Sequence, residues 1–173
     1  YIDEALELRN AGVPGPILAW LLSEDDGIAE AMDQDIDLSI ATEAQLLEVA
    51  DIARVRGIKA RVHIEVDTGL SRGGVTPSNW HLVFTEAQRL SAHIEVVSIW
   101  SHLACADEPS HPANEKQAQE FQRALAVAAE VGLNPQFTHL SNSAATLMLP
   151  DLRAGMVRCG IALYGVTPGG DLP

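Results

Sequence analysis

The sequence has few basic residues, only two cysteines and no long apolar run, and each of these features argues against a class of protein. It has 11 basic residues against 24 acidic ones, and this net charge of −13 disfavours nucleic acid or an anionic membrane as a partner. Its two cysteines, Cys105 and Cys159, have neither metal-binding nor redox spacing. No apolar run is long enough to span a bilayer, and no signal peptide precedes the first predicted element. These features predict a reduced, cytoplasmic protein.

The 173 residues fit one α/β domain, because apolar, strand-like segments alternate with helical ones and so favour parallel βαβ units. The predicted strands cover residues 17–21, 36–40, 60–66, 94–100, 137–140 and 157–159. The predicted helices cover residues 2–10, 42–56, 78–90, 113–132 and a short segment through Ala145 and Leu147. The second helix opens on the capping box Thr42-Glu43-Ala44-Gln45. The acidic run at 23–26 is predicted to be a solvated loop.

Polar side chains follow the ends of four predicted strands. In chain order they are Glu65, Asp67 and Arg72; His102; His139, Asn142 and Ser143; and Arg158 and Gly160. A (β/α)8 barrel has its active site at the carboxyl ends of its strands, often with phosphate held after the last two. A doubly wound sheet also binds ligands at its carboxyl edge. The glycine fingerprint of a dinucleotide fold is missing, however, because Gly69 and Gly73-Gly74 do not open a helix.

The segment from Val157 to Gly165 is the most informative one for function. Arg158 can only donate hydrogen bonds, and Gly160 lets backbone amides approach a phosphate closely. Together they favour a site for an anionic, heteroaromatic ligand. The alternative is a buried strand and a turn, with Arg158 in a structural ion pair. Asn142 and Ser143 could likewise do no more than cap a helix.

Other polar residues are given no function. His63 and His93 are interpreted as core or exposed histidines. Asp107, Glu108 and His111 lie near Cys105, but the cluster lacks the spacing of metal ligands, so no metal site is predicted.

Four ordered segments resemble the barrel domain of alanine racemases, which use pyridoxal 5′-phosphate (PLP). They are Glu65–Gly73, Ser101–Asp107, His139–Ala145 and Arg158–Gly165. The opening Ile2–Ala5 resembles the helix after the family's second barrel strand. The resemblance implies a partial (β/α)8 TIM barrel of about six βα units, corresponding to strands three to eight. Residues 1–165 would form this domain, and 166–173 would begin the connection to a missing C-terminal β domain.

The resemblance also implies which residues hold the cofactor. Arg158 would donate to the pyridine nitrogen of PLP, supported by His139. The phosphate would be held by two neighbouring loops, while other side chains pack against the ring. The complete implied set is Trp20, His102, His139, Asn142, Ser143, Arg158, Gly160 and Ile161.

On the substrate side, the resemblance implies that Arg72 orients the substrate carboxylate and the family's catalytic tyrosine. Glu65 stands where the family often has a carbamylated, and therefore anionic, lysine. We expect its carboxylate to lie beside Arg72, which would lower the pKa of Glu65 unless burial outweighs the attraction.

Both proton-transfer groups of the family are missing from this sequence. Lys59 precedes a predicted strand and Lys116 lies in a predicted helix, so neither can form the Schiff base with PLP. Tyr1 and Tyr164 do not match the family's tyrosine. The implied activity is that of a complete homodimer, which interconverts L- and D-alanine and supplies D-alanine for the bacterial cell wall. The chain by itself is predicted to be inactive.

Two alternatives stay open. One is another PLP barrel enzyme, either an amino-acid racemase or a decarboxylase, although Arg158 argues against a decarboxylase, which would favour a carboxylate at the pyridine nitrogen. The other is a non-catalytic PLP-binding barrel protein.

Overall fold

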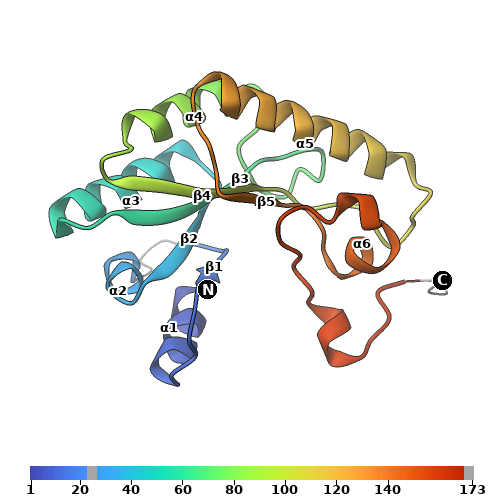
Figure 1. Cartoon of the computed structure of the whole chain (residues 1–173), viewed down its shortest axis with the longest axis horizontal. Helices are drawn as coiled ribbons and strands as arrows, with labels where there is room; N and C mark the ends of the chain where they lie inside the picture. The colour runs from blue at the N-terminus through green and yellow to red at the C-terminus, as the bar shows by residue number, and fades with distance from the viewer. Residues whose placement is uncertain (23–26, 170–173) are drawn as a thin grey trace.

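The computed structural model describes residues 1–22 and 27–169 (Figure 1). The predicted acidic loop at 23–26 and residues 170–173 of the predicted connection lie outside the described residues. The described elements are α1 (Ile2–Asn10), β1 (Ile17–Ala19), α2 (Ile28–Asp33), β2 (Ile36–Ile40), α3 (Glu43–Arg56), β3 (Ala60–Glu65), α4 (Trp80–Arg89), β4 (Ile94–Trp100), α5 (Pro112–Glu130), β5 (Phe137–His139), α6 (Ser143–Met148) and the 3-10 turns η1 (Pro150–Leu152) and η2 (Ile161–Tyr164).

The five strands form one open parallel sheet in the order β1-β2-β3-β4-β5, which confirms the α/β class. The sheet is arched into a half-barrel. Helices α3, α4 and α5 lie on its convex side, and the segments before β2 and after β5 extend from its two ends on the other side (Figure 1). None of the described helices is both long and apolar enough to cross a membrane.

Alternation along the strands gives the sheet two different faces. On the outer face, Leu38, Ile40, Val62 and Ile64 are fully buried in the apolar core beneath the helices. The residues between them point to the concave side, which we call the inner face. It consists of Asp37, Ser39, Arg61, His63 and Glu65, with Ser98, Trp100 and His139 in register beside them. The two faces thus follow directly from the period of two in a strand.

A β-bulge in β4 keeps the polar residues on one side. Val62 pairs with Val96, but the next residue, His63, pairs with Ser98, so Val97 is an extra residue. The bulge exchanges the faces along β4. Glu95 shares the inner face with Arg61 before it, and Ser98 and Trp100 share that face after it.

Helix α3 begins as the sequence indicates. The Thr42 hydroxyl accepts a hydrogen bond from the backbone N–H of Gln45 at 3.2 Å. The Gln45 side chain, however, accepts from the backbone N–H of Ala41 at 2.8 Å rather than from that of Thr42. The predicted cap is present, with its return bond displaced by one residue.

The predicted sixth strand at 157–159 is wrong. After β5, the chain makes only one isolated bridge, between His139 and Met156, and the Arg158 N–H donates to the Ser141 carbonyl at 3.0 Å. β5 is itself only three residues long and lies at the sheet edge, so it offers a short ladder. Gly160 then turns the chain into η2. The predicted first strand also ends earlier, at Ala19, and α2 was not predicted.

Candidate functional site

Three adjoining hollows lie at the carboxyl ends of the strands, with Trp20 lining each of them. They have volumes of about 390, 290 and 390 Å³. All the predicted site residues except His139 line at least one of these hollows, namely Trp20, Glu65, Arg72, His102, Asn142, Ser143, Arg158, Gly160 and Ile161. The structure therefore brings together residues that are up to 141 positions apart in the sequence (161 − 20).

Arg158 lies at the centre of this site, and its guanidinium holds three elements together. One terminal nitrogen is 2.6 Å from Nδ1 of His139, and the other donates to the Ser101 carbonyl at 2.7 Å. The second nitrogen also donates to the Leu140 carbonyl at 3.3 Å. Its Nε, by contrast, is buried and has no hydrogen-bond partner among the described residues. One strong donor of the site is thus left free.

His139 is fully buried behind Arg158, and its other ring nitrogen continues a chain of contacts that the sequence did not predict. Its Nε2 is 3.0 Å from Nδ1 of His63, and Nε2 of His63 is 3.1 Å from the Asp37 carboxylate. Arg61 completes the chain by donating to both carboxylate oxygens of Asp37, at 2.7 and 3.2 Å. The interpretation of His63 as a core histidine is confirmed by its burial. Residues two apart in a strand share a face, so the position of Glu65 could have predicted that His63 lies on the same face as the site.

Burial and positive charge determine the protonation of the site. Burial, reinforced by Arg158 and His63, lowers the pKa of His139 from 6.5 to about 2. Burial also lowers the pKa of His102 to about 4, with Arg158 and Arg72 adding to the effect. The pKa of Arg158 falls to about 10 for the same reason, although Glu65 opposes the fall. At neutral pH the two histidines are therefore uncharged and the arginine is charged.

Aromatic rings form a stack through the middle of the site. Trp100 lies nearly parallel to His139, with 5.4 Å between ring centroids, and Trp20 also stacks with Trp100, with 5.8 Å between their centroids. The Arg158 guanidinium lies 4.6 Å from the Trp100 ring centroid. Trp100 Nε1 also donates to the Ser39 hydroxyl at 2.9 Å, which fixes the ring. A planar ligand at this site would lie next to flat aromatic and guanidinium groups.

The loops after β5 and before η2 adjoin, as the sequence predicts. The Ser143 hydroxyl accepts from the backbone N–H groups of Gly160 at 2.8 Å and Ala162 at 3.3 Å. Ala162 directly follows Ile161, which lines the same hollow as Ser143. Asn142 caps α6, because its side-chain oxygen accepts from the Ala145 N–H at 3.0 Å. Asn142 therefore caps the helix and lines the hollow at the same time.

Glu65 and Arg72 line one hollow together with Gly73 and Trp100, but they do not form an ion pair within 4.0 Å. Glu65 is buried, and burial raises its pKa despite the attraction of Arg72 and then Arg158. Desolvation therefore outweighs charge pairing, which is the exception that the sequence-based expectation allowed for.

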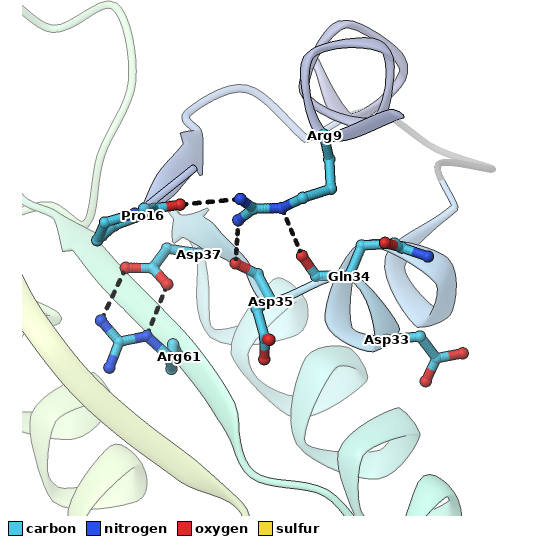
Figure 2. A pocket seen from close by; sticks show the side chains of 8 residues that line it. Arg9, Pro16, Asp33, Gln34, Asp35, Asp37 and Arg61 are labelled. Carbon is cyan, nitrogen blue, oxygen red and sulfur yellow. Dashed lines mark hydrogen bonds and ion pairs between the residues drawn. The ribbon is translucent and has the colours of Figure 1, made fainter. Parts of the chain in front are cut away.

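A further large hollow, about 480 Å³, lies away from this site, at the amino ends of the strands (Figure 2). Arg9 extends across it, but all three of its guanidinium nitrogens already donate to backbone carbonyls, those of Val13, Gly15, Gln34 and Asp35. Figure 2 also shows the Asp37–Arg61 pair in its wall. Because its donors are already paired, this hollow offers less binding chemistry than the carboxyl-end site.

Neither lysine reaches the site. Lys59 immediately precedes β3, at the opposite end of the strand from Glu65, and Lys116 lies within α5. Both cysteines are free thiols. Among residues 1–22 and 27–169, no group of three or more histidine, cysteine, aspartate and glutamate side chains is placed to hold a metal ion.

Comparison with known proteins gives a consistent result. The family model described as "Alanine racemase, N-terminal domain" matches residues 1–168. The alanine racemase of Thermobifida fusca is 46% identical over 100% of this chain and 47% of its own length. That of Salinispora tropica is 45% identical over 96% of this chain and 45% of its own length. The chain thus spans about half the length of the curated relatives it matches.

Solved structures agree with the sequence relatives. The alanine racemase from D-cycloserine-producing Streptomyces lavendulae superposes with a TM-score of 0.94 at 42% identity, covering 96% of this chain and 44% of that one. The alanine racemase from Bacillus anthracis with bound L-Ala-P gives a TM-score of 0.87 at 32% identity, covering 96% and 43%. The half-barrel of this chain is therefore similar to part of a larger known fold.

Proposed function

Because the chain belongs to the alanine racemase family, we propose that it forms the cofactor-binding barrel portion of a PLP-dependent enzyme that interconverts L- and D-alanine. The observation that carries the proposal is the unpartnered, buried Nε–H of Arg158 at the centre of the site. A donor left unsatisfied in a buried position is costly, and an unprotonated pyridine nitrogen is an acceptor that would satisfy it.

The residues around Arg158 fit the rest of the cofactor. Ser143 lies where the two loops converge. Its hydroxyl oxygen accepts from the Gly160 and Ala162 amides, so its hydroxyl hydrogen remains free to donate to a phosphate. We include Gly160, Asn142 and Ile161 in this phosphate site because they line the same hollow as Ser143. His102, which lines the same hollow, and Trp20 of the stack would contact the ring.

We further propose that the cofactor, when bound, acts as an electron sink that makes the Cα proton of alanine acidic. Arg158 donates to the ring nitrogen and keeps it unprotonated, because a guanidinium with a pKa of about 10 does not release its proton at neutral pH. This restrains the electron sink and favours return of the proton to Cα over side reactions. Arg72 orients the substrate carboxylate, and Glu65 supplies a carboxylate in the same hollow.

The proton-transfer groups are not supplied by this chain, because neither lysine lies at the site. We assign them to the half of the family's length that this chain does not match, with a lysine on one side of Cα and a tyrosine from the partner protomer of a homodimer on the other. This arrangement predicts that the 173-residue chain alone does not racemise alanine.

The finer assignments follow from the same premise. We propose that β1 to β5 correspond to the third to seventh barrel strands, and that residues 156–159, which make one bridge and no strand here, occupy the position of the eighth. Residues 1–165 then belong to the barrel domain, and 166–173 begin the connection to a C-terminal β domain. We also propose a cytoplasmic location, a role in supplying D-alanine for peptidoglycan, and no nucleic-acid or membrane partner; the net charge of −13 supports the last point.

A decarboxylase or a non-catalytic PLP-binding protein are the competing functions. Arg158 disfavours the first, because decarboxylation benefits from a protonated ring nitrogen, which a guanidinium cannot provide.

The test is to purify the complete protein that carries this segment, add PLP, and measure D-alanine formed from L-alanine with a coupled D-amino-acid oxidase assay. We expect PLP-dependent turnover, and the isolated chain serves as the inactive control. Release of CO₂ from amino acids would identify a decarboxylase. PLP binding without any turnover would identify a binding protein.

A further inference from the structure

The contacts behind Arg158 form one continuous line across the inner face. Arg158 contacts His139, His139 contacts His63, His63 contacts Asp37, and Asp37 contacts Arg61, with distances of 2.6 to 3.1 Å between the hydrogen-bonding atoms. The line starts at the carboxyl-end site and finishes at the wall of the large hollow at the amino ends of the strands (Figure 2). The family resemblance gives a role only to its first two members.

The chemistry of the two ends fixes the direction of every hydrogen bond between them. A guanidinium only donates, so Nδ1 of His139 must accept from Arg158 and carry no proton. A neutral His139 then has its proton on Nε2 and donates it to Nδ1 of His63. His63 must therefore carry its own proton on Nε2, which donates to Asp37. A carboxylate only accepts, so the line ends there.

We infer that His63 and Asp37 are positioning residues, which hold His139 in the Nε2–H tautomer so that its Nδ1 accepts from Arg158. The opposite tautomer would place an N–H of His139 against an N–H of Arg158 at 2.6 Å. Asp37 acts here as the carboxylate of a catalytic triad does, by fixing a ring tautomer rather than by taking a proton.

Burial strengthens the effect of His63 and Asp37 on the tautomer of His139. The residues Asp37, His63 and His139 are at most 3% exposed, so water cannot replace a lost partner. Burial alone would raise the pKa of Asp37, but hydrogen bonds from His63 and Arg61 outweigh it and lower the pKa. Arg61 therefore keeps the terminal acceptor ionised, while Trp100 stacked on His139 fixes the plane of that ring.

Asp37→Asn is the discriminating substitution. An amide has one oxygen, and Arg61 donates to Asp37 through two nitrogens. We expect the amide to turn its oxygen to Arg61 and its NH₂ to His63. His63 would then accept at Nε2 and donate from Nδ1, which reverses His139 and places a donor against Arg158.

Glu95→Gln is the matched control. Glu95 is the second carboxylate beside Arg61, at 3.6 Å, and it makes the same acid-to-amide change without contacting His63. Its expected effect on the histidine tautomers is none.

The experiment is magic-angle-spinning NMR of the complete protein labelled with ¹⁵N-histidine and free of cofactor, with the His139 signals assigned by their loss in a His139→Asn variant. In the wild type we expect a one-bond N–H coupling at Nε2 of both His139 and His63. In Asp37→Asn we expect the coupling of His139 to move to Nδ1. A coupling at Nδ1 of His139 in the wild type would overturn the inference, even if the variant does not fold. An unchanged tautomer in Asp37→Asn, or an equal change in Glu95→Gln, would do the same.

The consequence for catalysis rests on the proposed function. We expect Asp37→Asn to lower kcat of the PLP-loaded enzyme about 10- to 100-fold, the size of effect known for residues hydrogen-bonded behind metal-ligating histidines, with little change in KM. If the wild type shows the expected tautomers but no racemase activity, the proposed function fails and the inference about His63 and Asp37 survives.

Discussion

The outer and inner faces of the half-barrel sheet are made by the same strands but are stabilised by different interactions. The outer face presents Leu38, Val62 and Ile64 to a helix layer that includes Phe84 and Phe121, all fully or almost fully buried. The inner face presents acids, histidines and tryptophan, and nearly every buried polar atom there has a partner. Polar pairing, rather than apolar packing, organises the inner face.

The difference between the two faces separates the residues that stabilise the fold from those that serve function. Apolar packing on the outer face contributes free energy of folding without specifying a ligand. The inner face offsets the cost of buried polar groups by hydrogen bonding them to one another. Among the described residues, Arg158 Nε is the one buried side-chain donor at the site without a partner. Three substitutions test whether the two faces separate in this way.

The largest effect is expected from the outer face. Phe84→Ala removes a fully buried ring on α4 and should lower the free energy of unfolding by about 3–5 kcal/mol. Urea denaturation of the complete protein measures it. Leu82→Ala, on the exposed side of the same helix, should change the free energy by less than about 0.5 kcal/mol. Equal effects of the two variants would contradict the assignment of this face to stability.

Arg158→Glu is expected to act on function. A carboxylate in place of the guanidinium favours a protonated pyridine nitrogen, so racemisation should fall on the order of a hundredfold. Transamination should rise relative to racemisation, because a protonated ring is a stronger electron sink. Pyruvate formed per racemisation event measures the ratio, and PLP absorbance checks that the cofactor is bound. A ratio equal to that of the wild type would count against Arg158 as the residue at the ring nitrogen.

The smallest effect concerns pH. The pKa of His139 is about 2 in the folded protein and 6.5 ordinarily, so below pH 6.5 the unfolded chain binds a proton that the folded protein does not. The contribution of His139 to stability is complete above about pH 6.5 and is lost as the pH falls toward 2. Between pH 7 and pH 5 this loss is at most about 2 kcal/mol.

His139→Gln should therefore flatten the dependence of the free energy of unfolding on pH between 7 and 5. Phe84→Ala is the control, because it should lower stability equally at both pH values. Parallel curves for the wild type and His139→Gln would show that the inner face does not titrate in this way.

Local chemistry made most of the fold predictable. The Thr42 cap and the period of two in β2 and β3 depend only on residues that are close together in the sequence. The predicted bounds of β2 and β4 are confirmed. The predicted strand at 157–159 failed because its apolar composition does not reveal whether a neighbouring strand is available. Only one bridge, from His139 to Met156, forms there.

The sequence predicted the residues at the carboxyl ends of the strands, but not the hydrogen-bonded residues buried behind them. Strand-end position and motif located Arg158, Ser143 and His102 in the same place. The extension through His63 to Asp37 depends on register between β2, β3 and β5, which are separated by 26 and 76 residues along the chain. The sequence could not decide whether burial or Arg72 controls the pKa of Glu65, because burial is a property of the folded environment and not of the residue.

The bulge at Val97 bears on how this family of barrels can vary in length. Because Val97 is the extra residue, a strand that lost it would pair regularly and would keep Glu95, Ser98 and Trp100 on the inner face. A regular strand of unchanged length would instead send Ser98 and Trp100 to the helix layer and bring Ile99 to the ligand side. It would thereby remove the Trp100 ring that stacks with Trp20 and with His139. Natural gaps of one residue within β4 should therefore fall at the bulge.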